Sequence, residues 1–437
     1  MRRRGVAPVL LPTFEAMSDE PVAHPVQPLL DNLFRRESGR LTASLTRFFG
    51  SKHLELAEDV VQDTLLKAMH EWPFKGIPDD PVAWLHRVAK NGAIDKLRRD
   101  ARGVELLKEN SPLLRSEWSL AATVSEELRE DTIQDDQLRM FFACCHPSLP
   151  ADQQVALVLK TLCGFSVAEI ARAFITKEET INKRLYRARE AFRELGQLEI
   201  PHGDALNTRM EPVLSSIYLL FNEGYNSTSH DDLIREDLIE EALRLGDLLT
   251  RNSATDLPET HALLALMIYH AARSEARADA DGAIVLLQDQ DRTKWNKELI
   301  ALADAHLHQA SAGERMTVYH LEAGIASMHA NAPAFSATNW PTIVSLYDEL
   351  VRLKPSPVVL FNRAIALAQA EGPAKGLSAL DDVRGSEGSH LYHAARGDLL
   401  RDLSRMGEAR EAYARAVALA RSPAEIDLLR AKLAACG

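Results

Sequence analysis

The chain has 437 residues, of which 46% are hydrophobic and 26% are charged, and its formal net charge is −12. A chain of this length should hold roughly three domains with packed cores, and its negative charge argues against nonspecific coating of nucleic acid. The charge is uneven, because residues 1–200 carry 28 Lys and Arg against 30 Asp and Glu, whereas residues 201–437 carry 23 against 33. We therefore expect any contact with DNA to use local basic patches in the first half.

The helix formers Ala, Leu, Glu and Arg dominate the chain, and runs of β-branched residues are scarce, so the composition predicts an all-α protein. No apolar run reaches the roughly 18 residues of a membrane span, and we expect no membrane partner. The four cysteines have no repeated pair spacing, which is typical of reduced thiols in a cytoplasmic protein. Cys144, Cys145 and His146 are adjacent, but neighbouring helical side chains diverge by about 100°. Because no second ligand pair exists, we interpret the cysteines as core residues and expect neither metal nor cofactor.

Residues 1–28 have the composition of a disordered tail, and Met17 is an alternative start. Two helices follow as far as Met69. In the second, Leu56, Val60, Thr64 and Ala68 recur every four residues and predict a buried face. Its other face is acidic and carries Glu55, Glu58, Asp59, Gln62 and Asp63. Such a face can be merely solvated, or it can bind a basic partner.

The next predicted helix covers about residues 82–99. Its predicted buried side contains Leu85, Val88, Ala89 and Gly92, and its predicted exposed side contains Arg87, Asn91, Ile94 and Arg98. Asp95 stands four residues before Arg99 and can brace it. Residues 81–103 hold six Lys and Arg against two Asp, which together with Trp84 suits a surface that holds a phosphate backbone and unstacked bases. The alternative is an ordinary basic helix facing solvent.

Residues 104–135 hold eight Asp and Glu against three basic residues and show weak apolar periodicity, so they are predicted to form an acidic linker. Structure resumes at Asp136 and leads to residues 165–192, which have the pattern of two tightly joined helices. Ser166 and Glu169 form a predicted capping box at the start of the first helix. The second helix begins near Lys177, and one face of it carries Ile181, Leu185, Ala188 and Phe192.

The opposite face of that second helix is polar and basic, with Glu179, Thr180, Lys183, Tyr186 and Arg187. A helix of this kind, behind a short helix and a tight turn, fits the major groove of DNA. The pattern alone is also compatible with an amphipathic helix pair whose charged face is solvated. The preceding acidic and basic helices favour the DNA-binding interpretation.

The order of these segments resembles that of extracytoplasmic-function (ECF) sigma factors of the sigma-70 family. The resemblance rests on Ala57-Glu-Asp-Val-Val-Gln-Asp-Thr, on Ala83-Trp-Leu-His-Arg-Val-Ala-Lys-Asn-Gly-Ala-Ile-Asp-Lys-Leu-Arg-Arg, on the linker and on the helix-turn-helix, and it covers about residues 29–196. It implies that residues 29–103 bind core RNA polymerase and open the minus-ten promoter element. It also implies that residues 136–196 read the minus-thirty-five element.

The resemblance further implies roles for individual residues. Glu58, Asp59, Gln62 and Asp63 would face the polymerase. Arg87, Asn91, Asp95, Arg98 and Arg99 would lie near minus-ten DNA. Lys177, Glu179, Thr180, Lys183, Arg184 and Arg187 would belong to the minus-thirty-five surface. The chain departs from the family at Ile175, where the turn usually carries Gly, and a non-Gly residue in a left-handed turn position costs roughly 1 kcal/mol.

The remaining residues are predicted to form Ala-rich amphipathic helices, with a helical extension over residues 197–340 and tetratricopeptide-like repeats over residues 341–437. Tyr218 to Tyr225 reads as a helix end with Gly224 as its C-cap. Tyr347, Leu380 and Tyr413 are spaced by 33 residues, close to the tetratricopeptide period of about 34. The alternative is a helical bundle without repeats. With Cys144-Cys145-His-Pro147 before the helix-turn-helix, the layout resembles the ECF subgroup that carries such a fused extension.

The sequence therefore predicts an all-α transcription-initiation factor, in which two small helical sigma domains joined by a linker precede a large α-helical, partly tetratricopeptide-like domain. Its expected partners are core RNA polymerase, promoter DNA and a regulatory protein or peptide on the C-terminal helices. We expect no enzyme, since no nucleotide-binding loop, metal quartet or nucleophile triad is present. The alternative function is a conventional helix-turn-helix regulator with a tetratricopeptide sensor domain. The extension could mask DNA, hold a peptide, or keep the two sigma domains compact, and a chain ending near Gly196 would distinguish these roles.

Overall fold

The computed structural model describes residues 26–99, 130–174, 176–195, 201, 203–225, 235–279, 283–420 and 423–436. Every regular element in these ranges is helical, apart from an isolated bridge between Ala278 and Ile284, which confirms the all-α prediction. Most of the predicted tail and linker, and the turn residue Ile175, lie outside the described residues.

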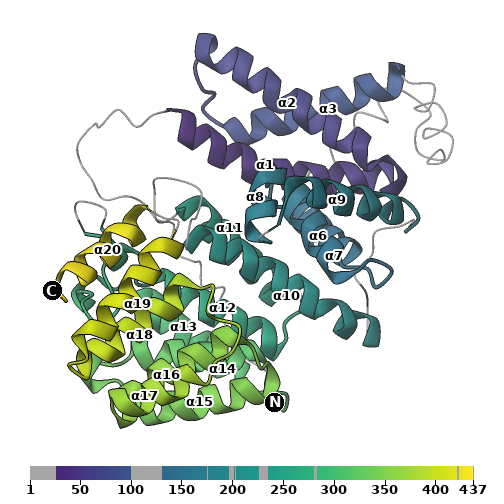
Figure 1. Ribbon diagram of the computed structural model, residues 1–437. Helices are drawn as coiled ribbons and strands as arrows, with labels where there is room; N and C mark the ends of the chain where they lie inside the picture. The colour runs from purple at the N-terminus through teal and green to yellow at the C-terminus, as the bar shows by residue number, and fades with distance from the viewer. Residues whose placement is uncertain are drawn as a thin grey trace.

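The first three helices form a small unit of their own (Figure 1). They are α1 (Val26–Phe49), α2 (Leu54–Lys75) and α3 (Pro81–Arg99). Leu41 and Leu45 of α1 pack with Val60 of α2 and with Leu85 and Ala89 of α3 in one apolar core. The core therefore uses the four-residue spacing that the sequence shows on α2 and α3.

The next four helices contain the helix-turn-helix. They are α6 (Glu130–Cys144), α7 (Ala151–Thr161), α8 (Val167–Ala173) and α9 (Glu178–Arg193). The predicted capping box is confirmed at the start of α8, where the backbone N–H of Glu169 donates to Ser166 Oγ at 3.1 Å. In return, the backbone N–H of Ser166 donates to Glu169 Oε2 at 2.7 Å. This pair of bonds satisfies two backbone N–H groups that the start of a helix otherwise leaves unpaired.

The extension begins with five helices that share their apolar core with α6 to α9. They are α10 (Asp204–Tyr225), α11 (Glu236–Arg251), α12 (Pro258–Ala271), α13 (Lys297–Ala310) and α14 (Val318–Ala330). One continuous cluster runs from Leu138 of α6 through Phe192 of α9 to Ala330 of α14. The helix-turn-helix is thus built into the extension rather than set beside it.

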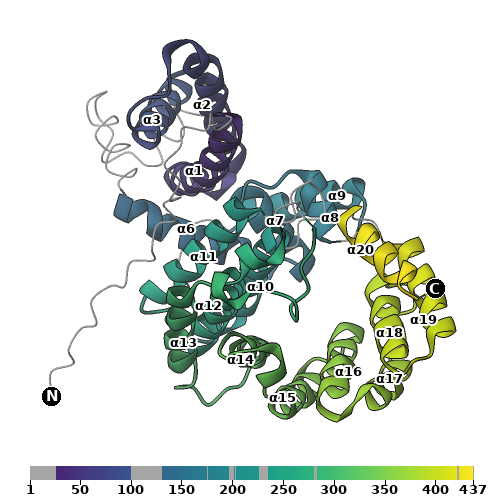
Figure 2. The same ribbon diagram turned by 90° about the vertical axis from the view of Figure 1, so that its left-hand side faces the viewer.

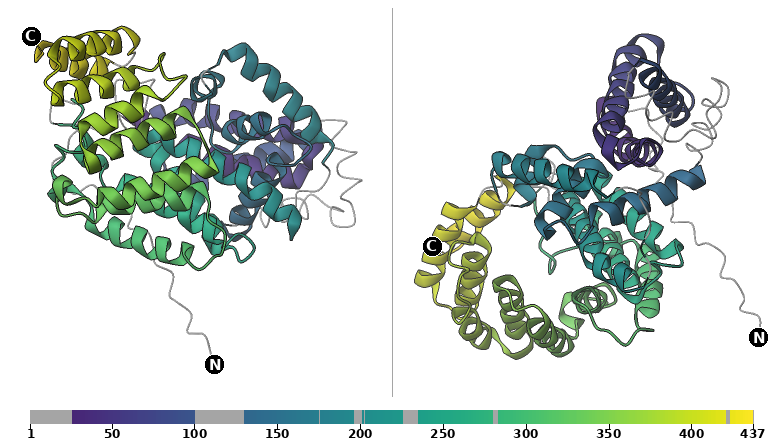
Figure 3. Two further views of the ribbon diagram at one scale, coloured as in Figure 1. Left: turned by 60° about the horizontal axis from the view of Figure 1, so that its bottom comes forward. Right: turned by 90° about the vertical axis from the view of Figure 1, so that its right-hand side faces the viewer.

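The last six helices follow one another along a curve (Figures 2 and 3). They are α15 (Trp340–Leu353), α16 (Pro357–Glu371), α17 (Pro373–Asp381), α18 (His390–Asp402), α19 (Met406–Leu419) and α20 (Pro423–Ala434). Helices adjacent in the chain pack together. Gly397 of α18 lies so close to the ring of Tyr413 on α19 that a Cβ would come 2.7 Å from its Cδ1 atom. The two helices therefore approach closely where a glycine faces an aromatic ring.

Gly224 does not form the C-cap that its position suggested. It lies inside α10, its φ is not positive, and the helix ends at Tyr225. Gly224 faces the start of α11, where a Cβ would lie 2.9 Å from the backbone nitrogen of Ile239. The glycine is needed for a close approach of two helices, a tertiary requirement that leaves no local pattern.

Candidate nucleic-acid interface

Helix α9 has the two faces that its sequence predicts. Ile181, Leu185, Ala188 and Phe192 are buried. On the other side Lys183 is 69% exposed, and its Nζ atom lies 2.7 Å from Glu179 Oε1. Tyr186 and Arg187 are exposed beside it, and Lys177 is the exposed N-cap residue. The helix therefore presents a polar, mostly cationic strip with an aromatic ring, which suits a nucleic-acid groove.

Arg184 and Thr180 differ from the rest of the predicted recognition set. The Nε atom of Arg184 lies 2.7 Å from Asp152 Oδ2 at the start of α7. Its guanidinium also lies 5.3 Å from the centroid of the Phe174 ring. Only 26% of the Arg184 side chain is exposed. Thr180 is half-buried. Arg184 therefore braces α9 against α7 and α8, which orients the exposed strip.

Helix α3 presents a second polar line. Arg87, Asn91 and Asp95 are exposed and follow one another at intervals of four residues, so they lie along one side of the helix. The side chains of Arg98 and Arg99 lie outside the described residues. Trp84 is half-buried and packs edge-on against Trp72, with ring centroids 5.4 Å apart.

The expectation that Ile94 shares the exposed side of α3 was wrong. Ile94 is 7% exposed and belongs to the apolar core of the first unit. Helix α3 packs against both α1 and α2, so its buried sector is wider than a single stripe. A pattern with a single buried stripe assumes one partner helix, and it therefore assigned Ile94 to the exposed side of α3.

The acidic face of α2 is divided in two. Asp59 and Asp63 are 65% and 66% exposed, and both pair with Lys96 of α3, at 3.6 and 3.2 Å. Gln62 is exposed beside them. Farther along α2, exposed Leu66, Met69 and Phe74 extend this surface with apolar side chains, a mixture typical of a protein interface.

The other half of the acidic face is in contact with α9. Arg189 Nη2 donates to both carboxylate oxygens of Glu58 at 3.0 Å. One turn earlier on α2, Glu55 pairs with Arg193 of α9. Sequence reasoning assigned no role to either arginine. Because opposite charges on distant helices leave no local signal, only the packing of the two units identifies the pairs.

Helix α1 also meets α6 and α7 directly. Gly39 faces the end of α7 so closely that a Cβ would come 2.0 Å from the carbonyl oxygen of Leu162. Arg47 of α1 pairs with the buried Asp136 of α6 at 2.7 Å. The first unit and the helix-turn-helix are therefore in contact through both α1 and α2.

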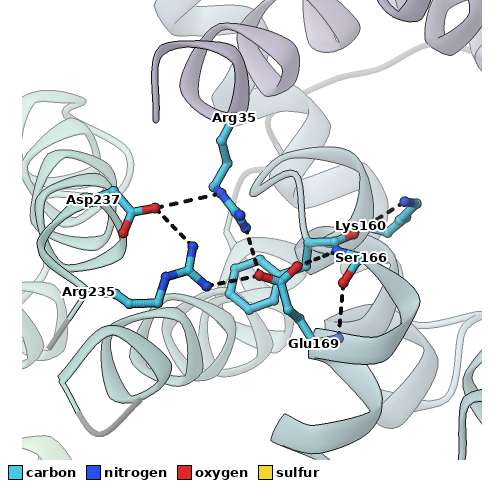
Figure 4. A network of polar contacts seen from close by, with 7 residues as sticks. Arg35, Lys160, Ser166, Glu169, Arg235 and Asp237 are labelled. Atoms are coloured by element: carbon cyan, nitrogen blue, oxygen red, sulfur yellow. Dashed lines mark hydrogen bonds and ion pairs between the residues drawn. The ribbon is translucent and has the colours of Figure 1, made fainter. Parts of the chain in front are cut away.

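Four charged residues join α1, α8 and the segment that opens α11 (Figure 4). Arg35 of α1 lies 3.3 Å from Glu169 of α8 and 3.7 Å from Asp237 of α11. Arg235 contacts the same two carboxylates, at 2.9 and 3.0 Å. We call these four residues the junction. Arginines and carboxylates alternate around it, so each charge has two opposite neighbours, and the extension supplies half of the group.

Glu169 is the most strongly held member of the junction. Burial alone would raise its pKa, but Arg35, the backbone and hydroxyl of Ser166, and Arg235 together lower the pKa to about 2. Glu169 is therefore ionised at neutral pH. The sequence identified Glu169 only as a capping residue. In the structure it also binds Arg35, which is 134 residues away in the chain, and Arg235, which is 66 residues away.

The cysteines take part in packing. Cys144, Cys145 and Cys163 are buried, and burial raises the pKa of the Cys144 thiol to about 12. Within the described ranges, no group of three His, Cys, Asp or Glu side chains is arranged to hold a metal ion. In the same part of the chain, no helix is both long and apolar enough to cross a membrane.

Three segments match known families. Residues 33–103 match sigma-70 region 2, residues 142–192 match sigma-70 region 4, and residues 209–311 match a family of unknown function, DUF6596. No solved structure shows a significant match to this chain.

The relatives fall into two kinds. An uncharacterized protein of Rhizobium meliloti is 39% identical over 89% of this chain and 92% of its own length. The ECF RNA polymerase sigma factor SigM of Mycobacterium tuberculosis is 31% identical over 36% of this chain and 72% of its own length. The ECF RNA polymerase sigma-E factor of Haemophilus influenzae is 30% identical over 36% of this chain and 82% of its own length.

Proposed function

Since this chain belongs to the ECF sigma factors and carries a large C-terminal extension, we propose that it contacts promoter DNA through α3 and α9 and core RNA polymerase through α2. In this proposal Arg87, Asn91 and Asp95 face the minus-ten element. Lys177, Glu179, Lys183 and Arg187 face the minus-thirty-five element. The observation that carries the proposal is the presence of exposed polar faces on two separate helices, α3 and α9, together with the exposed acidic and apolar side chains of α2.

The alternative, a conventional helix-turn-helix regulator, accounts for less of the molecule. Such a protein needs α9 but gives no role to the exposed line on α3. A conventional regulator also gives no partner to the exposed apolar side chains of α2, which are Leu66, Met69 and Phe74. These side chains lie on the same helix as the exposed Asp59 and Asp63. A polymerase-binding protein uses all three surfaces.

The proposed function is tested by in-vitro transcription with purified core polymerase and a library of promoter sequences. We expect the full-length protein to direct initiation from a defined set of promoters that share both elements. DNA binding without any initiation would favour the conventional regulator and contradict the proposal.

The arrangement of the two units suggests how this activity is controlled. The minus-ten and minus-thirty-five elements are about 25 base pairs apart, or roughly 85 Å at about 3.4 Å per base pair. In the structure α9 and α2 are joined by side-chain ion pairs, and Arg189 Nη2 donates to Glu58 at 3.0 Å. We infer that the two units separate when the protein engages both elements of a promoter.

We propose that the extension stabilises this closed arrangement. It contributes Arg235 and Asp237 to the junction with Arg35, and it shares a continuous core with the helix-turn-helix. Arg244 of α11 also donates to Gln137 of α6 at 3.2 Å. Arg189 already binds the carboxylate of Glu58. If core polymerase contacts Glu58, it must first displace Arg189 and with it α9. Polymerase binding and separation of the two units are therefore coupled.

This coupling is tested by Arg35→Gln, which removes one charge from the junction and leaves the capping box of α8 intact. We expect a larger radius of gyration in small-angle X-ray scattering and tighter binding to core polymerase. The matched control is Arg36→Gln, because Arg36 is the next residue, is half exposed and contacts no junction residue among those described. Equal scattering and equal polymerase affinity for the two variants would contradict the coupling.

A further inference from the structure

The extension contains a cavity of about 350 Å³ between α10, α12, α14, α15 and α16. This volume is within the range of small-molecule sites, roughly 300–1,000 Å³. Most of its wall is apolar, with Leu266, Ile325, Leu350 and Val359 among the lining residues. The polymerase and DNA surfaces use none of these residues, so the cavity is independent of the proposed function.

One end of the cavity is acidic. Glu322 of α14 lines it, and the Oε2 atom of Glu322 is buried without a hydrogen-bond partner among the described residues. Tyr218 shares a side-chain hydrogen bond with the same carboxyl group, and Tyr347 lies on the adjacent wall. Burial raises the pKa of Glu322, a cost that a cationic partner would remove. A carboxylate with neighbouring aromatic rings suits an ammonium group.

The other lining polar groups are cationic or neutral. His329 lies seven residues after Glu322 on the same helix, or roughly 10 Å along its axis. Its buried Nδ1 atom has no hydrogen-bond partner within the described ranges. Burial, together with Arg273 and Arg292, lowers the pKa of His329 to about 4, so its ring is neutral at pH 7. Arg273 also lines the cavity and carries the positive charge at this end.

We propose that the cavity binds a small zwitterion, with an ammonium group on Glu322, an anionic group on Arg273 and His329, and an apolar chain of roughly 10 Å between them. Ile325 lies between Glu322 and His329 on the face of α14 that lines the cavity, where it contacts the apolar chain. Val358, at the start of α16, lines the cavity and is 66% exposed, so the entrance lies beside it.

The proposal is tested by isothermal titration calorimetry on the full-length protein with 4-aminobutanoate, 6-aminohexanoate and 8-aminooctanoate. We expect affinity to rise with chain length, because only the longest probe spans both ends. Octanoate and octylamine, which keep the eight-carbon chain but carry one charge each, should bind at least roughly tenfold more weakly than 8-aminooctanoate, since each loses one charged contact.

Two variants assign the binding to this cavity. Glu322→Gln keeps the shape of the side chain and should weaken 8-aminooctanoate binding roughly tenfold or more. Val358→Trp adds bulk at an exposed position, so it should leave the melting temperature unchanged and block entry. Glu349→Gln, an exposed change on α15, is the matched control and should have no effect.

Three results would overturn the proposal. The first is the absence of binding by any zwitterion at millimolar concentration, which would indicate that the cavity holds water only. The second is equal binding by wild type and Val358→Trp. The third is binding of octanoate as tight as that of 8-aminooctanoate, which would indicate that the ammonium group makes no contact with Glu322.

Discussion

Lys183 and Arg184 are adjacent in the sequence, yet their surroundings in the structure are different. Among the described residues Lys183 pairs only with the exposed Glu179, whereas Arg184 is held between Asp152 and the ring of Phe174. The helical period places the two side chains about 100° apart, which separates a solvent position from a packed one. Residue type and spacing predicted a basic strip on α9, but they could not distinguish a cation that binds DNA from one that braces the fold.

The basic strip can be tested by Lys183→Ala combined with Arg187→Ala. Both side chains are exposed, so the variant should keep its melting temperature and its affinity for core polymerase. Affinity for minus-thirty-five DNA should fall by about 1–3 kcal/mol per lost contact, and the salt slope should shrink by about 1 for each lost phosphate contact. Fluorescence anisotropy over a range of salt concentrations measures both quantities.

Arg184→Ala is the matched control for that experiment. It removes the contacts with Asp152 and Phe174, so its main effect should be a lower melting temperature. If Arg184→Ala reduced the salt slope while the double variant left DNA binding unchanged, the assignment of the strip would be wrong.

The acidic face of α2 gives a second test at this scale. Asp59→Lys with Asp63→Lys should weaken association with core polymerase, because like charges that meet across an interface cost several kcal/mol. Both aspartates are exposed and pair with Lys96 of α3, whereas α9 pairs with Glu58 of the same helix. Pull-down with core polymerase measures the effect.

Glu71→Lys is the control for charge reversal on the same helix. Glu71 pairs only with Lys67 and Lys75 of α2 among the described residues. We expect this variant to bind polymerase normally. Normal binding by the double aspartate variant as well would remove α2 from the proposed polymerase surface.

At the scale of elements, helix α1 has a role that its amphipathic pattern does not reveal. One side of α1 packs on α2 and α3, as an amphipathic helix in a small domain should. Its other side faces α6 and α7, where Gly39 allows close contact and Arg35 and Arg47 reach distant carboxylates. Periodicity predicts which residues of a helix are buried on one side, but it does not reveal a second partner. For the same reason Ile94 and Gly224 were assigned to the wrong roles.

Gly39→Ala tests the contact between α1 and α7. The added Cβ would lie 2.0 Å from the carbonyl oxygen of Leu162, so the backbones must move apart. We expect a loss of about 1–3 kcal/mol in the stability of the closed arrangement. Opening should appear as a larger radius of gyration and faster hydrogen exchange in α6 and α7.

Gly92→Ala is the control within the same three-helix unit. Its Cβ would lie 3.6 Å from a side-chain carbon of Val60, which is an ordinary contact. This variant should keep the dimensions of the wild type. An unchanged radius of gyration for Gly39→Ala would show that α1 and α7 adapt without opening.

At the scale of the whole molecule, the all-α fold, the order of the helices and the helix-turn-helix could be predicted from the sequence. These features follow from local composition, caps and periodicity. The junction and the shared core could not be predicted, because they join segments far apart in the chain. Arg35 and Glu169 are 134 residues apart, and neither stands in a pattern that indicates the other.

The shared core leads to a prediction about truncation. A chain that ends at Leu195 keeps every residue of α6 to α9 but removes α10 and α11, which pack against α6 and α7. The bond from Arg209 to the backbone oxygen of Phe142 is lost with them. The apolar sides of α6 and α7 would then face water, at a cost of roughly 25 cal/mol for each Å² exposed. We therefore expect a lower melting temperature and strong binding of a hydrophobic dye.

A chain that ends at Thr338 provides the matched comparison, because it removes α15 to α20 but keeps α10 to α14. The core that includes the helix-turn-helix ends at Ala330, so this chain retains all of it, and the junction residues Arg235 and Asp237 remain. It should keep the closed dimensions and bind polymerase and promoter DNA with wild-type affinity. If the chain ending at Leu195 melted at the same temperature as the chain ending at Thr338, the extension would be a separate module, and its contribution to closure would be excluded. If only the shorter chain is destabilised, α10 to α14 are a structural part of the promoter-binding unit.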